Sequence, residues 1–164
     1  MSIRDYLRNR NVPFMALLHR PAPSATRLAQ SIHVDGKQVA KGVLIRTHHG
    51  FVLAVIPSTH RVSLERLAEF LGETSVCLAS EADLHQVFHD CECGAIPPFG
   101  RVYGLATVID TTLVGRSELI LQGNTRHEAI RIRYRDYEQV EAPRRGRLAE
   151  PIHPPKRKLQ RQAG

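Results

Sequence analysis

The chain has 164 residues, a net charge of +7, a hydrophobic fraction of 42% and three cysteines. That length fits one domain with a sizeable core, and three cysteines are too few, and odd in number, for a disulfide framework. No apolar run approaches the roughly 20 residues of a membrane helix, and the charged start lacks the apolar core of a signal peptide. The sequence therefore argues against a membrane or disulfide-rich secreted protein and predicts a cytoplasmic one.

The N-terminal quarter of the chain is predicted to hold two short helices with a strand between them. Ser2 is a suitable cap for a helix over residues 2–10, and the apolar run Phe14–His19 predicts a strand. A second helix is predicted over Ser24–Ile32, followed by a turn at Asp35–Gly36.

A hairpin of two strands is predicted next. Residues 38–47 alternate in character, and residues 50–57 are apolar on both sides, as in a central strand. On the first strand, Lys41 shares a side with Val39, Val43 and Ile45. A lysine among apolar neighbours is costly unless an anionic or polar group meets it, although the pattern equally allows Lys41 to reach solvent.

The remaining elements alternate between helices and strands. A helix over residues 64–71 has Ser63 as its cap and Gly72 after its end. A strand over 75–80, a helix beginning after Ser80, and strands over 103–110, 117–122 and 127–134 follow. Because strands outnumber helices and follow one another, we predict a single α+β domain with a mixed, mostly antiparallel sheet flanked by helices.

The positive charge is concentrated at the C-terminal end. Residues 143–164 contain seven Lys or Arg and one acid, whereas the rest of the chain is nearly neutral. We predict a folded domain over residues 1–141 and a basic, proline-rich tail over 142–164 that is largely disordered. A basic tail attracts polyanions such as RNA, and it also fits a solvated end.

Four potential zinc ligands are close together in the sequence. His85 and His89 lie four residues apart on a predicted helix, and Cys91 and Cys93 follow. The Cys-x-Cys spacing is tighter than the usual Cys-x-x-Cys turn, and no second pair completes a known pattern. We therefore predict no metal and no cofactor, and keep a zinc-binding protein as an alternative.

The stretch Gly94–Pro98 is predicted to be a stiff loop. Glycine lets a ligand approach closely, and Pro97 and Pro98 fix their own φ angles and bias the residues before them. The amides of Gly94, Ala95 and Ile96 are then free to meet a developing oxyanion without reorganisation. A rigid connector with no chemical role fits the same pattern.

Together, four segments resemble the YbaK/EbsC family, which includes the editing domain of bacterial prolyl-tRNA synthetases and its free-standing relatives. They are SATRLAQ (24–30), VAKGVLI (39–45), GAIPPFG (94–100) and GNTRHEAIRI (123–132), and the resemblance spans about residues 12–137. It implies a mixed sheet flanked by helices. It also implies trans-editing, the hydrolysis of the ester that links a wrong amino acid to tRNA.

The resemblance also implies roles for particular residues. No side chain acts as the nucleophile in the family; the lysine matched by Lys41 positions the substrate near the terminal ribose and phosphate. The loop matched by Gly94, Ala95 and Ile96 binds the aminoacyl carbonyl through backbone amides. The implied substrate-binding residues are His19, Pro97, Pro98, Phe99, Gly100, Gly123, Asn124 and His127.

Many relatives have a more glycine-rich loop with a serine before the proline, so Ala95, Ile96 and the double proline leave the edited amino acid open. The implied partner is aminoacyl-tRNA, with an aminoacyl-tRNA synthetase such as prolyl-tRNA synthetase as a further candidate. The sequence does not give the oligomeric state. The main functional alternative is a non-catalytic tRNA-binding or regulatory module on the same fold.

Overall fold

The protein is described by a computed structural model that covers residues 1–20 and 38–152. The helix predicted over Ser24–Ile32, the turn at Asp35–Gly36 and residues 153–164 of the predicted tail lie outside this part of the chain.

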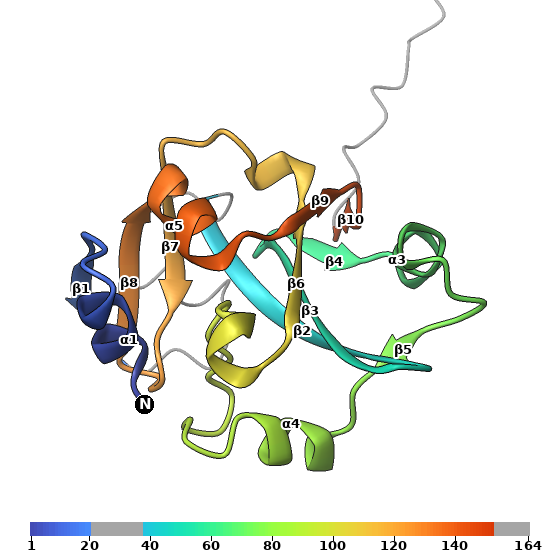
Figure 1. The fold of residues 1–164 in the computed structure, drawn as a ribbon, viewed down its shortest axis with the longest axis horizontal. Helices are drawn as coiled ribbons and strands as arrows, with labels where there is room; N and C mark the ends of the chain where they lie inside the picture. Colours follow the sequence, from blue (N-terminus) through green and yellow to red (C-terminus); the bar gives the residue numbers. More distant parts are fainter. Residues whose placement is uncertain (21–37, 153–164) are drawn as a thin grey trace, which may run out of the picture.

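A mixed sheet forms the centre of the molecule (Figure 1). Its strands lie in the order β1-β8-β7-β2-β3-β6-β9, and β5 adds to β2. Neighbours are antiparallel in the pairs β1–β8, β8–β7, β2–β3 and β2–β5, and parallel in the other three, which confirms the predicted sheet. The strands are β1 (Met15–Leu18), β2 (Val39–Thr47), β3 (Gly50–Pro57), β5 (Cys77–Leu78), β6 (Ala106–Asp110), β7 (Glu118–Gln122), β8 (Glu128–Arg133) and β9 (Arg144–Gly146).

Four α-helices lie in the described residues: α1 (Ile3–Asn9), α3 (Leu64–Leu71), α4 (Glu81–Val87) and α5 (Tyr134–Glu141). Ser2, Ser63 and Ser80 cap the first three as predicted, and Gly72 ends α3 with a left-handed φ of 69°. Two short 3-10 turns, η2 (Gly100–Tyr103) and η3 (Thr111–Leu113), flank β6. None of these helices is long and apolar enough to cross a membrane.

The central hairpin separates two hydrophobic cores. One face of β2 and β3 contributes Ala40, Leu44 and Leu53 to the larger core, which also contains residues of α1 and α5. The other face carries Val43 and Ile45 into a smaller core against α3. Lys41 therefore begins on the face of the smaller core, because side chains alternate along a strand.

The C-terminal part corrects the predicted domain boundary. Residues 144–151, expected in a disordered tail, form β9 beside β6 and β10 (Ala149–Pro151) beside β4 (His60–Val62). The side chain of Leu148 is fully buried, and Asp110 accepts hydrogen bonds from the N–H groups of Leu148 and Ala149 at 2.8 and 2.9 Å. Burial and these bonds order the segment despite its basic composition.

Candidate active site

Lys41 lies on β2 opposite Ile56 of β3. Its side chain is half-buried, and this burial lowers the pKa of its ammonium group below the ordinary value. In the described part of the chain, Lys41 forms no ion pair and no side-chain hydrogen bond. A half-buried cation without a counter-ion is costly, so a ligand that carries negative charge would stabilise it.

The Gly94–Pro98 loop crosses β2 at the residue after Lys41. A Cβ added at Gly42 would lie 3.1 Å from Cγ2 and 3.4 Å from the carbonyl oxygen of Ile96. Gly42 therefore faces the loop, and the absence of a side chain there allows the close approach. Lys41 begins on the opposite face of the same strand.

The edge of β2 beside Lys41 is open among the described residues. β7 pairs with β2 only at Val39 and Ala40, and β5 pairs only at Ile45 and Arg46. The stretch between these contacts has no strand neighbour on the side away from β3. A four-carbon lysine stem is long enough to turn around such an edge toward the loop.

The main-chain hydrogens of the loop are not equally available. The N–H of Ala95 donates to the carbonyl of Glu92 at 2.9 Å, and Ala95 is only 2% exposed. The expectation of a free amide at Ala95 is therefore wrong, because a local turn uses it. The N–H groups of Gly94 and Ile96 form no hydrogen bond in the described part of the chain. Gly94 has a φ of 87°, which reverses the chain and which other residues adopt only with strain.

The C-terminal end of the loop is anchored to α5. The hydroxyl of Tyr137 donates to the carbonyl of Pro98 at 2.6 Å, and the rings of Phe99 and Tyr137 meet edge to face at 5.4 Å. Pro97, Pro98, Phe99 and Gly100 are all buried. These four residues were expected at the substrate, but their placement suits them to hold the loop.

The N-terminal end of the loop is anchored to the turn between β7 and β8. The N–H of Glu92 donates to the carbonyl of Asn124 at 2.9 Å. The Glu92 carboxylate accepts the N–H of Arg126 at 2.6 Å and pairs with its guanidinium at 3.6 Å. These contacts, led by the backbone hydrogen bond, lower the pKa of Glu92. The two ends of the loop are thus held by two different elements, α5 and the turn between β7 and β8.

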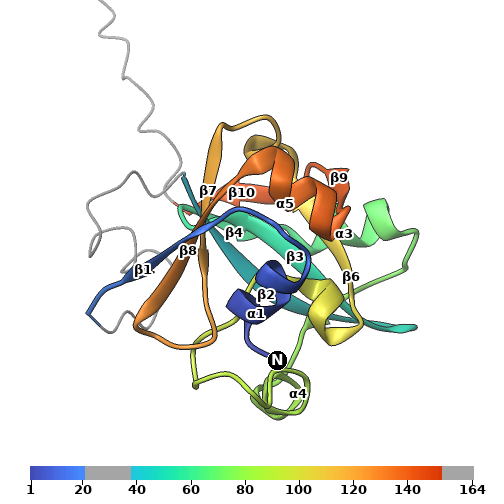
Figure 2. The ribbon, with the colours of Figure 1, turned by 60° about the vertical axis from the view of Figure 1, so that its left-hand side comes forward.

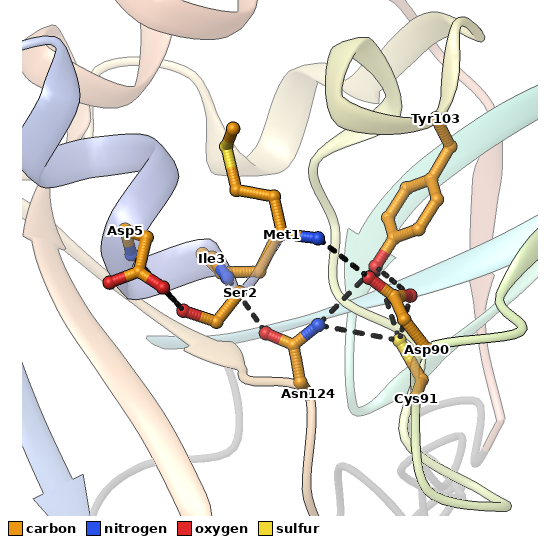
Figure 3. Close-up of polar contacts among 8 residues, drawn as sticks. All are labelled: Met1, Ser2, Ile3, Asp5, Asp90, Cys91, Tyr103 and Asn124. Atoms are coloured by element: carbon orange, nitrogen blue, oxygen red, sulfur yellow. Dashed lines mark hydrogen bonds and ion pairs between the residues drawn. The ribbon is translucent and has the colours of Figure 1, made fainter.

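The side chain of Asn124 is occupied within the protein (Figure 3). Its Oδ1 accepts the N–H of Ile3 at 2.8 Å, and its Nδ2 points to the Cys91 sulfur at 3.6 Å and the Tyr103 hydroxyl at 3.5 Å. Asp90 accepts hydrogen bonds from Tyr103 and Cys91. Asn124 was expected to bind substrate, but it links α1 to the loop instead.

The four potential zinc ligands do not converge. His85, His89 and Cys93 are exposed, whereas Cys91 turns toward Asn124 and Tyr103. Across residues 1–20 and 38–152, no three His, Cys, Asp or Glu side chains gather as a metal site requires. Burial raises the pKa of Cys91 to about 11, so its thiol stays protonated at neutral pH and is a poor nucleophile.

His19 and His127, both predicted to bind substrate, lie side by side at the end of the β1–β8 pair and are joined through their backbones. The N–H of His19 donates to the carbonyl of His127 at 2.9 Å. His127 is exposed, and it contributes to the low pKa of Glu92 at the start of the loop. Gly123, which precedes this turn, is packed so closely on Glu128 that a Cβ would lie 2.9 Å from its Cγ. Gly123 therefore shapes the turn, and His127 lies at its surface.

A cavity of about 170 Å³ opens between α4 and the loop. Its walls come from Leu84, His85 and Phe88 on one side and from residues 91–96 on the other. Lys41 does not line it. The sequence analysis named His85 only as a potential zinc ligand, and it missed Leu84 of α4, Phe88 at the end of that helix and the anchor Tyr137 on α5, because only the fold shows that they lie at the loop.

The family model for the aminoacyl-tRNA editing domain matches residues 19–140, so the chain belongs to that family. No curated protein matches the sequence.

Solved structures share the fold. A hypothetical protein named APE2540 superposes with a TM-score of 0.82 at 17% identity, over 90% of this chain and 99% of that one. A protein proposed to be a trans-editing enzyme for prolyl-tRNA synthetase gives 0.77 at 18% identity, over 90% and 94%. At such identities the likeness establishes the architecture alone, and the predicted fold is confirmed.

Proposed function

We propose that this protein is a trans-editing hydrolase that cleaves the ester bond of mischarged aminoacyl-tRNA. The observation that carries the proposal is the pair of N–H groups at Gly94 and Ile96. They have no partner in the described part of the chain, and they belong to a loop anchored at both ends beside a cavity. Membership of the editing family supports the choice of substrate.

The loop amides suit an ester carbonyl under attack by water. Negative charge develops on the carbonyl oxygen, and two fixed N–H donors stabilise it without reorganisation. Loss of one such donor costs about 3 kcal/mol in other enzymes. Water is the proposed nucleophile, since the nearby Cys91 thiol is protonated. The bond from the acyl carbon to the ribose oxygen breaks, and the free amino acid and the tRNA hydroxyl are released.

Lys41 is proposed to hold the tRNA end in place. Its ammonium group turns around the open edge of β2 and meets the terminal ribose and phosphate. This contact offsets the desolvation that lowers its pKa, and it orients the ester toward the loop. His19 and His127 are proposed to lie along the path of the same tRNA end.

The direct test is a deacylation assay with a panel of mischarged tRNAs, including alanine, cysteine and serine esters. We expect at least one ester to be hydrolysed much faster than it hydrolyses spontaneously, and correctly charged tRNA to be spared. Binding of tRNA without acceleration of any ester would contradict the proposal and favour a non-catalytic RNA-binding module. Repeating the assay with prolyl-tRNA synthetase tests that proposed partner.

Replacing Gly42 by alanine is expected to slow deacylation about tenfold, because the new methyl group presses on the side chain and carbonyl of Ile96 and moves the loop amides. Ile96→Ala removes the side-chain atom at 3.1 Å. Gly42→Ala should therefore slow deacylation less when it is added to Ile96→Ala than when it is made in the wild type. Single-turnover rates of the three variants, with urea unfolding as the stability control, check this. Equal rates for Gly42→Ala and the wild type would show that the loop does not depend on this contact.

A further inference from the structure

A second cavity, of about 300 Å³, is lined by residues at and after the end of α1 and by residues of η2 and α5. The ribbons of α1 and α5 can be followed in Figure 2. Its lining is mostly polar and is separate from the residues that line the cavity at the Gly94–Pro98 loop. The lining residues are Arg10, Asn11, Val12, Pro13, Arg101, Asp136, Gln139 and Val140.

Arg10 is held in place by an aromatic ring. Its guanidinium carbon lies 3.9 Å from the centre of the Tyr6 ring, and Tyr6 itself is buried. Such stacking leaves the N–H edges of a guanidinium free for a planar or tetrahedral anion. In the described part of the chain, the Arg10 side chain has no ion-pair partner.

Arg101, the residue after the buried Gly100, lines the cavity. Its backbone N–H donates to Glu141 at 3.1 Å, which fixes the start of η2. Its side chain also forms no ion pair within residues 1–20 and 38–152. Glu141 feels the charge of Arg101, but Oε1 is already the acceptor for Thr107 and the Arg101 amide.

The single carboxylate in the cavity wall is already neutralised. Asp136 accepts a hydrogen bond from the guanidinium of Arg133 at 2.7 Å. The carbonyl end of α1 is also occupied, because the carbonyls of Leu7 and Arg8 accept the N–H groups of residues 10–12. What remains in the wall is two guanidinium groups and the amide side chains of Asn11 and Gln139.

We propose that this cavity binds a backbone phosphate of RNA, with Arg10 and Arg101 as its charged ligands. Guanidinium groups bind phosphate oxygens through paired, charge-assisted hydrogen bonds. The inference rests on the proposed function, since the RNA is then the substrate tRNA. Arg101 lies three residues after Pro98, the last residue of the loop proposed to receive the tRNA end, so the proposal takes the RNA backbone leading away from the ester along this cavity.

The test measures the affinity of full-length protein for uncharged tRNA by fluorescence anisotropy at several salt concentrations. The double variant Arg10→Ala/Arg101→Ala is expected to bind about tenfold more weakly at about 0.1 M salt, and its log–log salt slope should become shallower by about 0.7 to 0.9, as for the loss of one phosphate contact. Arg10→Lys/Arg101→Lys keeps the charge and should keep most of the slope. Arg147→Ala removes an exposed arginine outside the cavity and is the matched control.

Unchanged affinity and slope in the double variant would overturn the proposal. A thermal midpoint raised by inorganic phosphate in the wild type, together with unchanged tRNA binding in the variant, would also overturn it and assign the cavity to a small phosphate compound. Uncharged tRNA carries no ester, so a loss of binding supports this inference even if the protein deacylates nothing.

Discussion

Replacing Lys41 by alanine is expected to lower the deacylation rate by at least about 100-fold and to leave the fold intact. The proposed role of Lys41 is orientation of the substrate ester, and misplacement of about 1 Å can cost this much. The variant should lose rate at saturating tRNA as well as affinity, because the lysine contacts the reacting end of the substrate.

Lys41→Met provides the matched control, since methionine keeps most of the stem and removes the charge. Burial lowers the pKa of Lys41, so its ammonium is disfavoured in the folded protein. The free energy of unfolding of Lys41→Met should therefore equal or exceed that of the wild type, while its activity is lost. Wild-type single-turnover rates in a stable Lys41→Met protein would remove Lys41 from the mechanism.

Replacing Glu141 by glutamine is expected to stabilise the protein at about pH 8 and to leave its stability unchanged near pH 4. Glu141 is 1% exposed, and burial raises the pKa of its carboxyl group to about 7, against the hydrogen bonds from Thr107, Arg101 and Gly100. Its Oε2 has no hydrogen-bond partner in the described residues. An ionised carboxylate in this position is therefore poorly compensated.

The direction in which the free energy of unfolding changes with pH depends on whether the folded or the unfolded state holds the Glu141 proton more tightly. The unfolded chain loses the proton of Glu141 near the ordinary glutamate pKa of 4.5, whereas the folded chain keeps it to about 7. The folded state binds more protons between these values, so its stability falls as the pH rises through this window. At about 1.4 kcal/mol per pH unit, the contribution reaches roughly 3 kcal/mol.

Urea unfolding of the wild type and Glu141→Gln from about pH 4 to about pH 8 measures this effect. The glutamine oxygen can still accept from Thr107 and Arg101, so the two curves should separate as the pH rises and stay parallel above about pH 7.5. Glu138→Gln, on the same helix but half-buried in an ion pair with Arg145, is a suitable control and should not reproduce the separation. A constant difference across the range would show that Glu141 does not titrate in this window.

Much of the fold could be predicted because its signals are local. The caps at Ser2, Ser63 and Ser80 depend on residues three positions away, and the turn of the β2–β3 hairpin lies within a few residues of both strands. β9 and β10 could not be predicted in the same way. Each has only three residues, and each is stabilised by partners far away in the sequence, such as Asp110.

In the candidate site, too, the local properties could be predicted and the long-range contacts could not. The stiffness of the Gly94–Pro98 loop follows from its own residue types. Whether an amide in that loop is free depends on its hydrogen-bond partners, and the turn from Glu92 to Ala95 uses one of the three. The side chain of Asn124 is likewise used by Ile3, 121 positions away. A sequence pattern can therefore identify the residues of a site more readily than the hydrogen-bond partners of those residues.

The most direct test of the catalytic role of the loop is a crystal structure with an amide-linked analogue of 3′-aminoacyl adenosine. We expect the analogue carbonyl oxygen at about 3 Å from the N–H groups of Gly94 and Ile96, with the Lys41 ammonium beside the ribose or its phosphate. An analogue bound elsewhere, or a carbonyl that meets neither amide, would contradict the proposal that these two amides stabilise the oxyanion.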